Sequence, residues 1–248
     1  MEDRLVDLSD LTVAILCGGR GTRLHPWTES IPKALVPLND RPILDYILEF
    51  YRRHGIRRFI FCIGYLGDKI RQRYEGSAKD FSIEFSDSGE KASMLERIVA
   101  VRDAEQPRLM VSYGDTFTSL DLHGMVRTHF QRRALATIVV APIQNPFGLI
   151  TFNPEGWVTS FREKPVLHYY IGHFIFERET YKLISPEMLG QPEGHGLVSL
   201  FSRLLEERKL ASFEHQGVQI TFNTESERRK AEEDLGKFYT FSEGSWQS

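Results

Sequence analysis

The stretch GGRGTRLHPWTESIPKALVP, residues 18–37, decides how this sequence is interpreted. The apolar run at residues 12–17 comes directly before it, which predicts a buried strand that ends in a tight loop. Gly18, Gly19 and Gly21 have no side chains, so the backbone there can approach a ligand and direct its N–H groups at phosphate oxygens. By itself the stretch therefore indicates either a phosphate-binding loop or simply a tight turn after a strand.

Two cations in the same stretch can supply the charge that phosphate binding needs. Arg23 follows the glycines, and Pro32 fixes the backbone just before Lys33. A dinucleotide fingerprint would require a third glycine where Leu24 stands, and the Gly-Lys-Ser/Thr of a P-loop is missing from the sequence. The loop thus fits neither a Rossmann dehydrogenase nor a P-loop kinase.

Beyond this loop, helical and extended patterns alternate along the chain. Helices are predicted over residues 43–51, 67–74 and 94–102, and strands over residues 59–63, 82–85 and 109–112. Because parallel strands need crossover connections, this order predicts a doubly wound α/β fold with a mostly parallel mixed sheet.

The second half of the chain has shorter extended runs, at residues 137–141, 149–152 and 158–162. They predict a smaller β-rich portion that extends over the sheet. We predict a single domain over residues 1–248, with one half at about 11–133, a second half at about 134–235, and a tail at 236–248 that is loosely ordered or packed on a partner.

Composition excludes several classes of protein. The chain has 248 residues, 41% of them hydrophobic and 26% charged, with a net charge of -3, so nothing draws it as a whole to nucleic acid or to an anionic membrane. It contains no apolar stretch of the roughly 20 residues that a membrane helix needs, and its acidic N-terminus is not a signal peptide.

Cys17 and Cys62 each lie in an apolar run, which indicates buried thiols in a reducing compartment. We expect a cytoplasmic protein.

Asp115, in the phrase SYGD, follows the predicted strand at residues 109–112. Ligands of open α/β sheets bind at the carboxyl ends of the strands, so Asp115 and the glycine loop are expected to face one crevice. Carboxylate oxygen is the ligand that Mg²⁺ prefers. The alternative is an aspartate that only caps a helix or forms a turn.

The glycine stretch resembles the signature of the sugar-1-phosphate nucleotidylyltransferases, which is G-G-x-G-T-R-L followed by Pro-Lys. Similar phrases recur through SYGD, FREKP and VQITFNTESERRKAEEDL, so the resemblance covers nearly the whole chain. The phrases FCIGYLGDKI, SDSGE and SYGDTFTSLDL look most like glucose-1-phosphate cytidylyltransferases. The fold that this implies is the Rossmann-like variant of nucleotide-diphospho-sugar transferases.

The resemblance also implies a reaction, in which a nucleoside triphosphate and a sugar 1-phosphate give an NDP-sugar and pyrophosphate with the help of Mg²⁺. It favours CTP, with GTP or dTTP as alternatives. It implies catalytic roles for Arg23, Lys33, Asp115 and Lys164, and Mg²⁺ ligands at Asp115 and Asn223. Nucleotide contacts are implied at Cys17, Gly18, Gly19, Gly21, Thr22, Gly89 and Gly114, and sugar-phosphate contacts at Gly148, Glu163, Lys164 and Gly172.

The sequence departs from the family pattern in two regions. Met94 and Leu95 stand where glycines are expected near the base, and Asn223 stands where relatives usually place a second magnesium-binding aspartate. Two alternatives therefore stay open, a cytidylyltransferase for a non-sugar phosphate such as phosphocholine and a catalytically silent nucleotide-binding regulatory homologue. A homo-oligomer is compatible with either.

Overall fold

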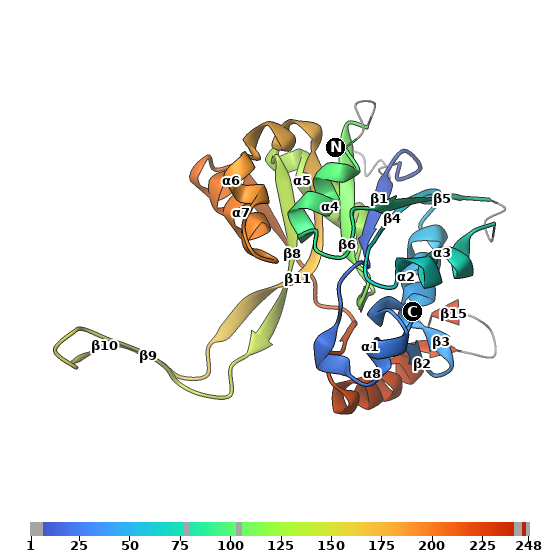
Figure 1. The fold of residues 1–248 in the computed structure, drawn as a ribbon. Coiled ribbons are helices and arrows are strands. Elements are labelled where there is room, and N and C mark those ends of the chain that lie inside the picture. The colour runs from blue at the N-terminus through green and yellow to red at the C-terminus, as the bar shows by residue number, and fades with distance from the viewer. Residues whose placement is uncertain (1–6, 77–79, 103–105, 241–244, 247–248) are drawn as a thin grey trace.

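A seven-stranded sheet forms the centre of the computed structural model, which describes residues 7–76, 80–102, 106–240 and 245–246 (Figure 1). Its strand order is β12-β8-β11-β6-β1-β4-β5. β11 runs antiparallel to β6 and β8, and the other neighbouring strands are parallel, so the predicted mostly parallel mixed sheet is confirmed. The strands are β1 (Thr12–Leu16), β4 (Arg58–Ile63), β5 (Ser82–Asp87), β6 (Arg108–Tyr113), β8 (Ala136–Gln144), β11 (Val166–Glu177) and β12 (Leu210–Glu214).

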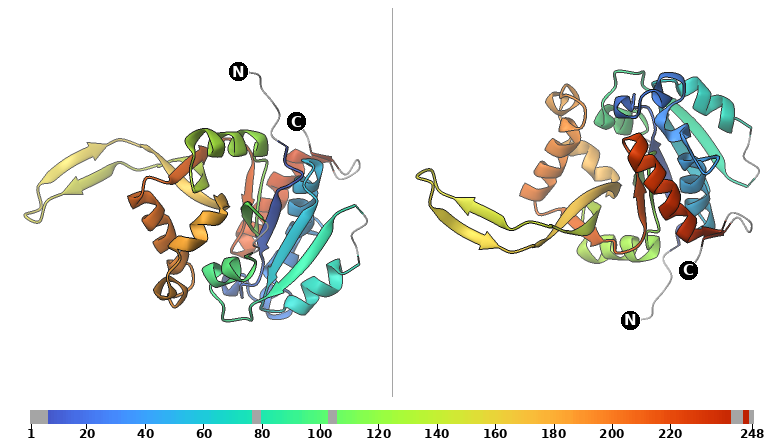
Figure 2. Two further views of the ribbon diagram at one scale, coloured as in Figure 1. Left: turned by 90° about the horizontal axis from the view of Figure 1, so that it is seen from above. Right: turned by 90° about the horizontal axis from the view of Figure 1, so that it is seen from below.

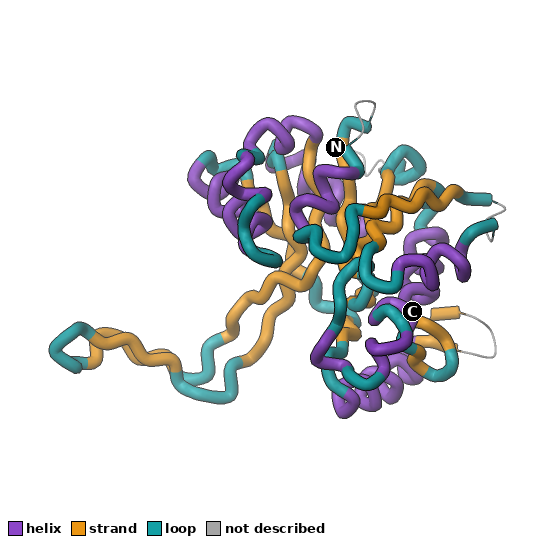
Figure 3. Tube along the Cα trace, viewed as in Figure 1, coloured by secondary structure: helices purple, strands orange, loops and turns teal. Residues whose placement is uncertain are grey.

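Helices cover both faces of the sheet (Figures 2 and 3). Side chains of successive strand residues point to opposite faces, so Val13 and Ile15 pack in one core and Ala14 packs in the other. This explains why the inner strands are apolar at nearly every position. The first core is shared with α2 (Ile43–Arg53), α3 (Gly67–Tyr74), α5 (Leu122–Arg132) and α8 (Glu225–Phe238), and the second with α4 (Met94–Ala100), α6 (Pro186–Leu189) and α7 (His195–Glu206).

The second half of the chain differs from the predicted extension over the sheet. β8 and β11 join the central sheet, where β11 is buried between β6 and β8. The apolar run of β11 suits a strand covered on both faces, which explains its central place. Of the predicted strands, β9 (Leu149–Phe152) and β10 (Val158–Arg162) pair with each other, outside the central sheet.

The shorter elements connect these layers. The predicted tail at 236–248 begins inside α8, after which two short strands pair, while residues 241–244 and 247–248 lie outside the described residues, as do residues 1–6. Within the described part of the chain, no helix is both long and apolar enough to span a membrane. These elements are η1 (Thr22–Leu24), α1 (Trp27–Ser30), η2 (Lys33–Leu35), β2 (Pro37–Leu38), β3 (Arg41–Pro42), β7 (Thr116–Thr118), η3 (Arg178–Leu183), β13 (Gln219–Thr221), β14 (Tyr239–Thr240) and β15 (Ser245–Trp246).

Candidate active site

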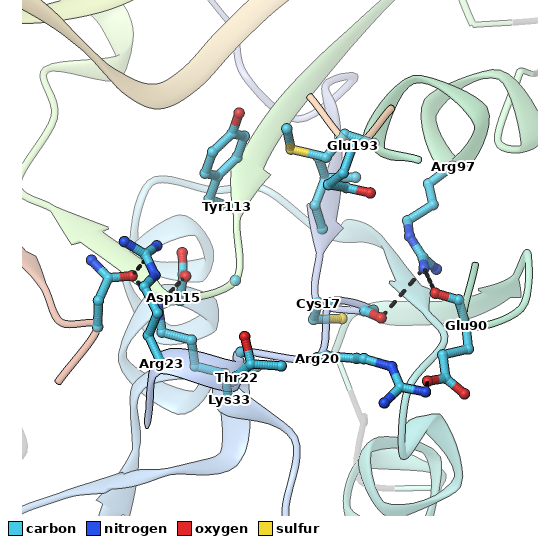
Figure 4. A pocket seen from close by; sticks show the side chains of 18 residues that line it. Cys17, Arg20, Thr22, Arg23, Lys33, Glu90, Arg97, Tyr113, Asp115 and Glu193 are labelled. Atoms are coloured by element: carbon cyan, nitrogen blue, oxygen red, sulfur yellow. Dashed lines mark hydrogen bonds and ion pairs between the residues drawn. The ribbon is translucent and has the colours of Figure 1, made fainter. Parts of the chain in front are cut away.

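A cavity of about 580 Å³ lies at the carboxyl ends of β1 and β6 (Figure 4). Its size is that of a site for a small ligand. The glycine loop and the segment after β6 both contribute to its walls, as the position of each after a strand predicts. The predicted site residues that line it are Cys17, Gly18, Gly19, Gly21, Thr22, Arg23, Lys33, Gly114, Asp115 and Asn223.

Two glycines shape the walls of this cavity. Gly21 has a φ of 59°, in the left-handed region, and a Cβ there would lie 3.1 Å from the Cβ of Lys33. Gly114 allows β1 and β6 to approach, because a Cβ there would lie 2.9 Å from the Cβ of Cys17. Cys17 itself is buried and unpaired, and burial raises the pKa of its thiol, so the prediction of a buried thiol is confirmed at this position.

Four of the predicted residues converge on one point of the cavity. Lys33 Nζ lies 2.5 Å from Asp115 Oδ2 and 3.0 Å from Asn223 Oδ1. Arg23 donates a second hydrogen bond to Asn223 Oδ1 over 2.8 Å. These contacts bring together two cations, one carboxylate and one amide from segments far apart in the sequence (Figure 4).

Arg97, which no sequence pattern indicated as a site residue, lies behind the glycine loop on α4 and is only 4% exposed. Its guanidinium donates to the carbonyl oxygens of Ile63 over 2.5 Å and of Gly89 over 2.9 Å. Longer hydrogen bonds reach the carbonyls of Gly18, at 3.3 Å, and Glu90, at 3.4 Å. Arg97 therefore joins the glycine loop to the segment that carries the predicted base contact, Gly89.

Other side chains that were not among the predicted site residues also line the cavity, including Tyr113 and Glu193. Figure 4 shows Tyr113 and Glu193 on the side opposite Thr22. Burial raises the pKa of both the Glu193 carboxyl and the Tyr113 hydroxyl. Met94, one of the two residues expected to lie near the base, lines the same cavity. No local sequence signal identified Glu193, because it lies in the loop before α7.

The predicted nucleotide contact Gly89 does not line the cavity, and the four predicted sugar-phosphate residues also lie elsewhere. Gly172, with a φ of 81°, packs on the ring of Tyr113, since a Cβ there would lie 2.7 Å from that ring. Gly148 and Glu163 stand at the root of the β9–β10 hairpin, where a Cβ on Gly148 would lie 3.4 Å from the Glu163 carboxylate. Glu163 and Lys164 form an exposed ion pair over 3.9 Å. None of these four residues lines the cavity, and their roles at the sugar phosphate stay a prediction.

Metal-binding side chains do not cluster in the described ranges, where no group of three or more His, Cys, Asp and Glu residues could hold an ion. The predicted ligands Asp115 and Asn223 are one carboxylate and one amide. His173, next to Gly172, is fully buried beside Tyr51 and Thr118, and burial lowers its pKa to about 3. It is therefore a neutral core histidine.

The fold resembles solved nucleotidyltransferase structures. A Bacillus anthracis protein assigned as a glucose-1-phosphate thymidylyltransferase and crystallised with sucrose superposes with a TM-score of 0.74 at 18% identity, over 93% of this chain and 97% of that one. The UTP-bound UGPase of Acinetobacter baumannii superposes with a TM-score of 0.67 at 15% identity, over 91% and 93% of the two chains. These similarities show the shared fold.

Sequence comparison identifies the family. A probable glucose-1-phosphate cytidylyltransferase of Bacillus subtilis is 26% identical over 238 residues, which are 86% of this chain and 92% of the relative. A mannose-1-phosphate guanyltransferase of Xenopus laevis is 31% identical over 61% of this chain, which spans only 44% of that longer protein. These comparisons confirm the family that the sequence motifs indicated. They also confirm the prediction that the protein is a nucleotidyl-transferring enzyme. The family model for nucleotidyl transferases matches residues 12–245, and the chain belongs to the nucleotidyl transferase family.

Proposed function

We propose that this chain transfers CMP from CTP to a sugar 1-phosphate, giving a CDP-sugar and pyrophosphate. The convergence of Arg23 and Lys33 on Asp115 and Asn223 beside a glycine loop carries this proposal. Relatives that transfer nucleotides to sugar 1-phosphates support the reaction class. The Bacillus subtilis cytidylyltransferase, which is similar over most of both chains, supports CTP, and its agreement with the cytidylyltransferase-like phrases of the sequence adds to that support.

The proposed reaction is an in-line substitution at phosphorus. An oxygen of the sugar 1-phosphate attacks the α-phosphorus, a new P–O bond forms, and the bond to the β-phosphate breaks as pyrophosphate leaves. Negative charge grows on the leaving group, so fixed cations near it lower the barrier. In our assignment Arg23 binds the triphosphate and the leaving pyrophosphate, and Lys33 binds the α-phosphate.

The hydrogen bonds of the two cations support that assignment. Arg23 and Lys33 both donate to the neutral amide oxygen of Asn223. A phosphate oxygen carries charge and accepts stronger hydrogen bonds than an amide does. Both cations can therefore give up their hydrogen bond to the Asn223 amide and donate to a triphosphate oxygen in its place. The Lys33 side chain is only 11% exposed, so its position is fixed before the triphosphate binds.

Mg²⁺ is part of the proposal. Asp115 Oδ2 and Asn223 Oδ1 accept hydrogen bonds from the same Lys33 ammonium, so both oxygens point at one cationic position. One carboxylate and one amide oxygen fit an ion that is usually held by few protein ligands and completes its shell with water and phosphates. When bound there, Mg²⁺ would neutralise charge on the triphosphate and the leaving pyrophosphate.

A pyrophosphate-release screen tests the proposal. The common nucleoside triphosphates are crossed with sugar 1-phosphates and with phosphocholine, in the presence of Mg²⁺. We expect the highest kcat/KM with CTP and a sugar 1-phosphate. A preference for GTP, UTP or dTTP would refute the base, a preference for phosphocholine would refute the acceptor, and no turnover with any pair would identify a silent homologue.

A single variant tests the division of roles. Lys164→Ala should raise the KM for the sugar 1-phosphate, or lower kcat, while leaving the KM for CTP within about twofold, because Lys164 is assigned to the acceptor phosphate. Loss of CTP affinity with an unchanged acceptor KM would show that the assignment is wrong.

A further inference from the structure

One hydrogen bond joins two side chains that lie 198 residues apart in the sequence. The indole Nε1 of Trp27, on α1, donates to Glu225 Oε2, on α8, over 3.0 Å. Figure 1 shows these two helices next to each other. Trp27 lies between Arg23 and Lys33 in the sequence, and Glu225 comes two residues after Asn223. The hydrogen bond therefore connects the two segments that carry the cationic end of the cavity.

Strand pairing does not hold the segment that contains Trp27. Between the end of β1 at Leu16 and the start of β2 at Pro37, the described chain forms only three short helices, η1, α1 and η2. α1 has four residues, and a helix of one turn is not stable by itself. Side-chain contacts must therefore fix the position of this segment, including its two cations.

Arg228, on α8, orients the Glu225 carboxylate toward the indole. Its Nε donates to Glu225 Oε2 over 2.9 Å, and one terminal nitrogen donates to Oε1 over 3.0 Å. The other terminal nitrogen donates to the carbonyl of Pro37 over 3.1 Å. The guanidinium also lies 5.2 Å from the centre of the Trp27 ring, and the Arg228 side chain is only 12% exposed. Because a forked arginine–carboxylate pair has one preferred geometry, the acceptor for the indole is fixed.

A second set of contacts attaches α8 to the other end of the same segment. Asn39 N donates to Glu232 Oε1, and Asn39 Nδ2 donates to the Glu232 carbonyl, both over 3.1 Å. Arg228 also donates to Glu232 Oε1, over 2.6 Å. α8 therefore contacts the chain on both sides of Lys33.

Thr28 connects α1 to the glycine loop. It is fully buried, and its hydroxyl donates to the carbonyl of Gly21 over 3.0 Å. The Tyr65 hydroxyl donates to the Thr28 carbonyl over 2.9 Å. A displacement of α1 would therefore also displace Gly21, which comes two residues before Arg23.

We propose that Trp27 and Glu225 are positioning residues for nucleotidyl transfer. Their hydrogen bond keeps the start of α8, and with it Asn223, at a fixed distance from the two cations of the cavity. The Asn223 amide cannot fix this distance alone, because a neutral acceptor binds a cation less strongly than a carboxylate does. The roles of Asn223 and of the two cations rest on the proposed function.

Trp27→Phe tests the proposal, because it removes the indole donor and keeps an aromatic ring beside Arg228. We expect kcat/KM for CTP to fall about tenfold, with the KM for the acceptor within about twofold of the parental value. Tyr181→Phe is the matched control. Its hydroxyl donates to the carbonyl of Ile98 over 3.3 Å, and η3 follows β11 at the edge of the sheet opposite to the cavity. Parental kinetic constants in Trp27→Phe, or equal losses in the two variants, would overturn the proposal.

The Asn223→Asp background separates positioning from a contribution to stability alone. An aspartate at this position would itself form ion pairs with Arg23 and Lys33. In that background, Trp27→Phe should therefore lower kcat/KM for CTP by less than about threefold, while its effect on Tm should equal that in the parent. A tenfold loss of kcat/KM in both backgrounds would show that the indole does not act through Asn223.

A double-mutant cycle tests whether the two side chains act through their hydrogen bond. Glu225→Met removes the acceptor, and the double variant with Trp27→Phe should lose about as much kcat/KM as the more impaired single variant. Losses that multiply would overturn the pairing. If circular dichroism shows that Glu225→Met does not fold, the two tests with Trp27→Phe decide alone.

Binding of pyrophosphate gives a readout that does not depend on turnover. By calorimetry we expect Trp27→Phe to weaken it about fivefold or more and Tyr181→Phe to leave it unchanged, because Arg23 is assigned to the leaving pyrophosphate. An unchanged Kd in Trp27→Phe would overturn the proposal. If the parent binds pyrophosphate with this dependence on Trp27 but shows no turnover, the proposed function fails and the positioning role stands.

Discussion

Replacing Arg97 with methionine tests whether one buried cation holds two walls of the cavity together. The guanidinium donates its shortest hydrogen bonds, of 2.5 Å and 2.9 Å, to the carbonyls of Ile63 and Gly89. Hydrogen bonds from charged donors contribute about 1.5–3 kcal/mol each, so the two together contribute about 3–6 kcal/mol. Removing a buried charge offsets part of this loss. We therefore expect the free energy of unfolding to fall by about 2–4 kcal/mol, and Tm by about 4–16 °C.

The same substitution should weaken nucleotide binding more than acceptor binding. Arg97 connects the Gly18 and Gly89 segments, which are both assigned to the nucleotide. If about 1.4 kcal/mol of the loss falls on the nucleotide complex, the KM for CTP rises tenfold while the KM for the acceptor stays near its parental value. Arg97→Lys keeps the positive charge but lacks the several N–H donors of the planar guanidinium. We expect its Tm and its KM for CTP to lie between those of the parent and of Arg97→Met.

The measurements are thermal unfolding for Tm, urea unfolding at equilibrium for the free energy, and initial rates of pyrophosphate release for KM. Arg132→Met is the control, because Arg132 is exposed at the end of α5. The control should leave Tm and both KM values near those of the parent. A fall in Tm with an unchanged KM for CTP would limit Arg97 to a stabilising role. An unchanged Tm would refute the contribution worked out from its hydrogen bonds.

Three further predictions concern the metal site and the core. Asp115→Asn should lower kcat by about 100-fold or more, because it removes the carboxylate from the proposed Mg²⁺ site; a near-parental rate at saturating Mg²⁺ would identify Asp115 as a turn residue. Asn223→Asp should lower the Mg²⁺ concentration for half-maximal rate, since a carboxylate binds this ion better than an amide does; an active parent that is harmed by the aspartate would instead indicate an acidic acceptor. Burial lowers the pKa of His173 to about 3, so this side chain stays neutral in the folded protein. In the unfolded chain it takes up a proton as the pH decreases below its ordinary pKa of about 6.5. The free energy of unfolding therefore decreases by about 1.4 kcal/mol for each pH unit that the pH is lowered between these two values. His173→Gln should flatten the fall in unfolding free energy between pH 7 and pH 5, and an equal slope in parent and variant would contradict this assignment.

Local sequence patterns predicted the alternating strands and helices from β1 to β6, but they did not indicate α5. An apolar run that stops at three glycines predicts β1 and its loop, and the structure ends the strand at Leu16, one residue before the end of the predicted run. Helical spacing likewise identified α2, α3 and α4. The central place of β11 could not be predicted in this way, because it depends on its pairing with β6, more than fifty residues earlier in the chain.

The same limit applies to the cavity. The position of Asp115 after a strand already predicted that it faces the glycine loop. The approach of Asn223 to Lys33 depends on the pairing of β13 with β7, so only the family resemblance indicated it beforehand. Arg97 was missed because arginine on a short amphipathic helix is normally solvated. Its burial depends on space left by Gly18 and Gly64, where a Cβ would lie 2.3 Å and 2.6 Å from its guanidinium.

The β9–β10 hairpin separates two properties of the molecule, its stability and its choice of acceptor. Every residue of β10 is exposed, and neither core cluster contains a residue of the hairpin. Substitutions in the hairpin therefore act on residues that are distant from the packed interior, so their effects on unfolding should be small and additive with those of core substitutions. Because the residues assigned to the acceptor lie at the root of this hairpin, acceptor preference can change by mutation while the stability of the folded body is left nearly constant. A chain built in this way can diversify its choice of sugar at little risk to its fold.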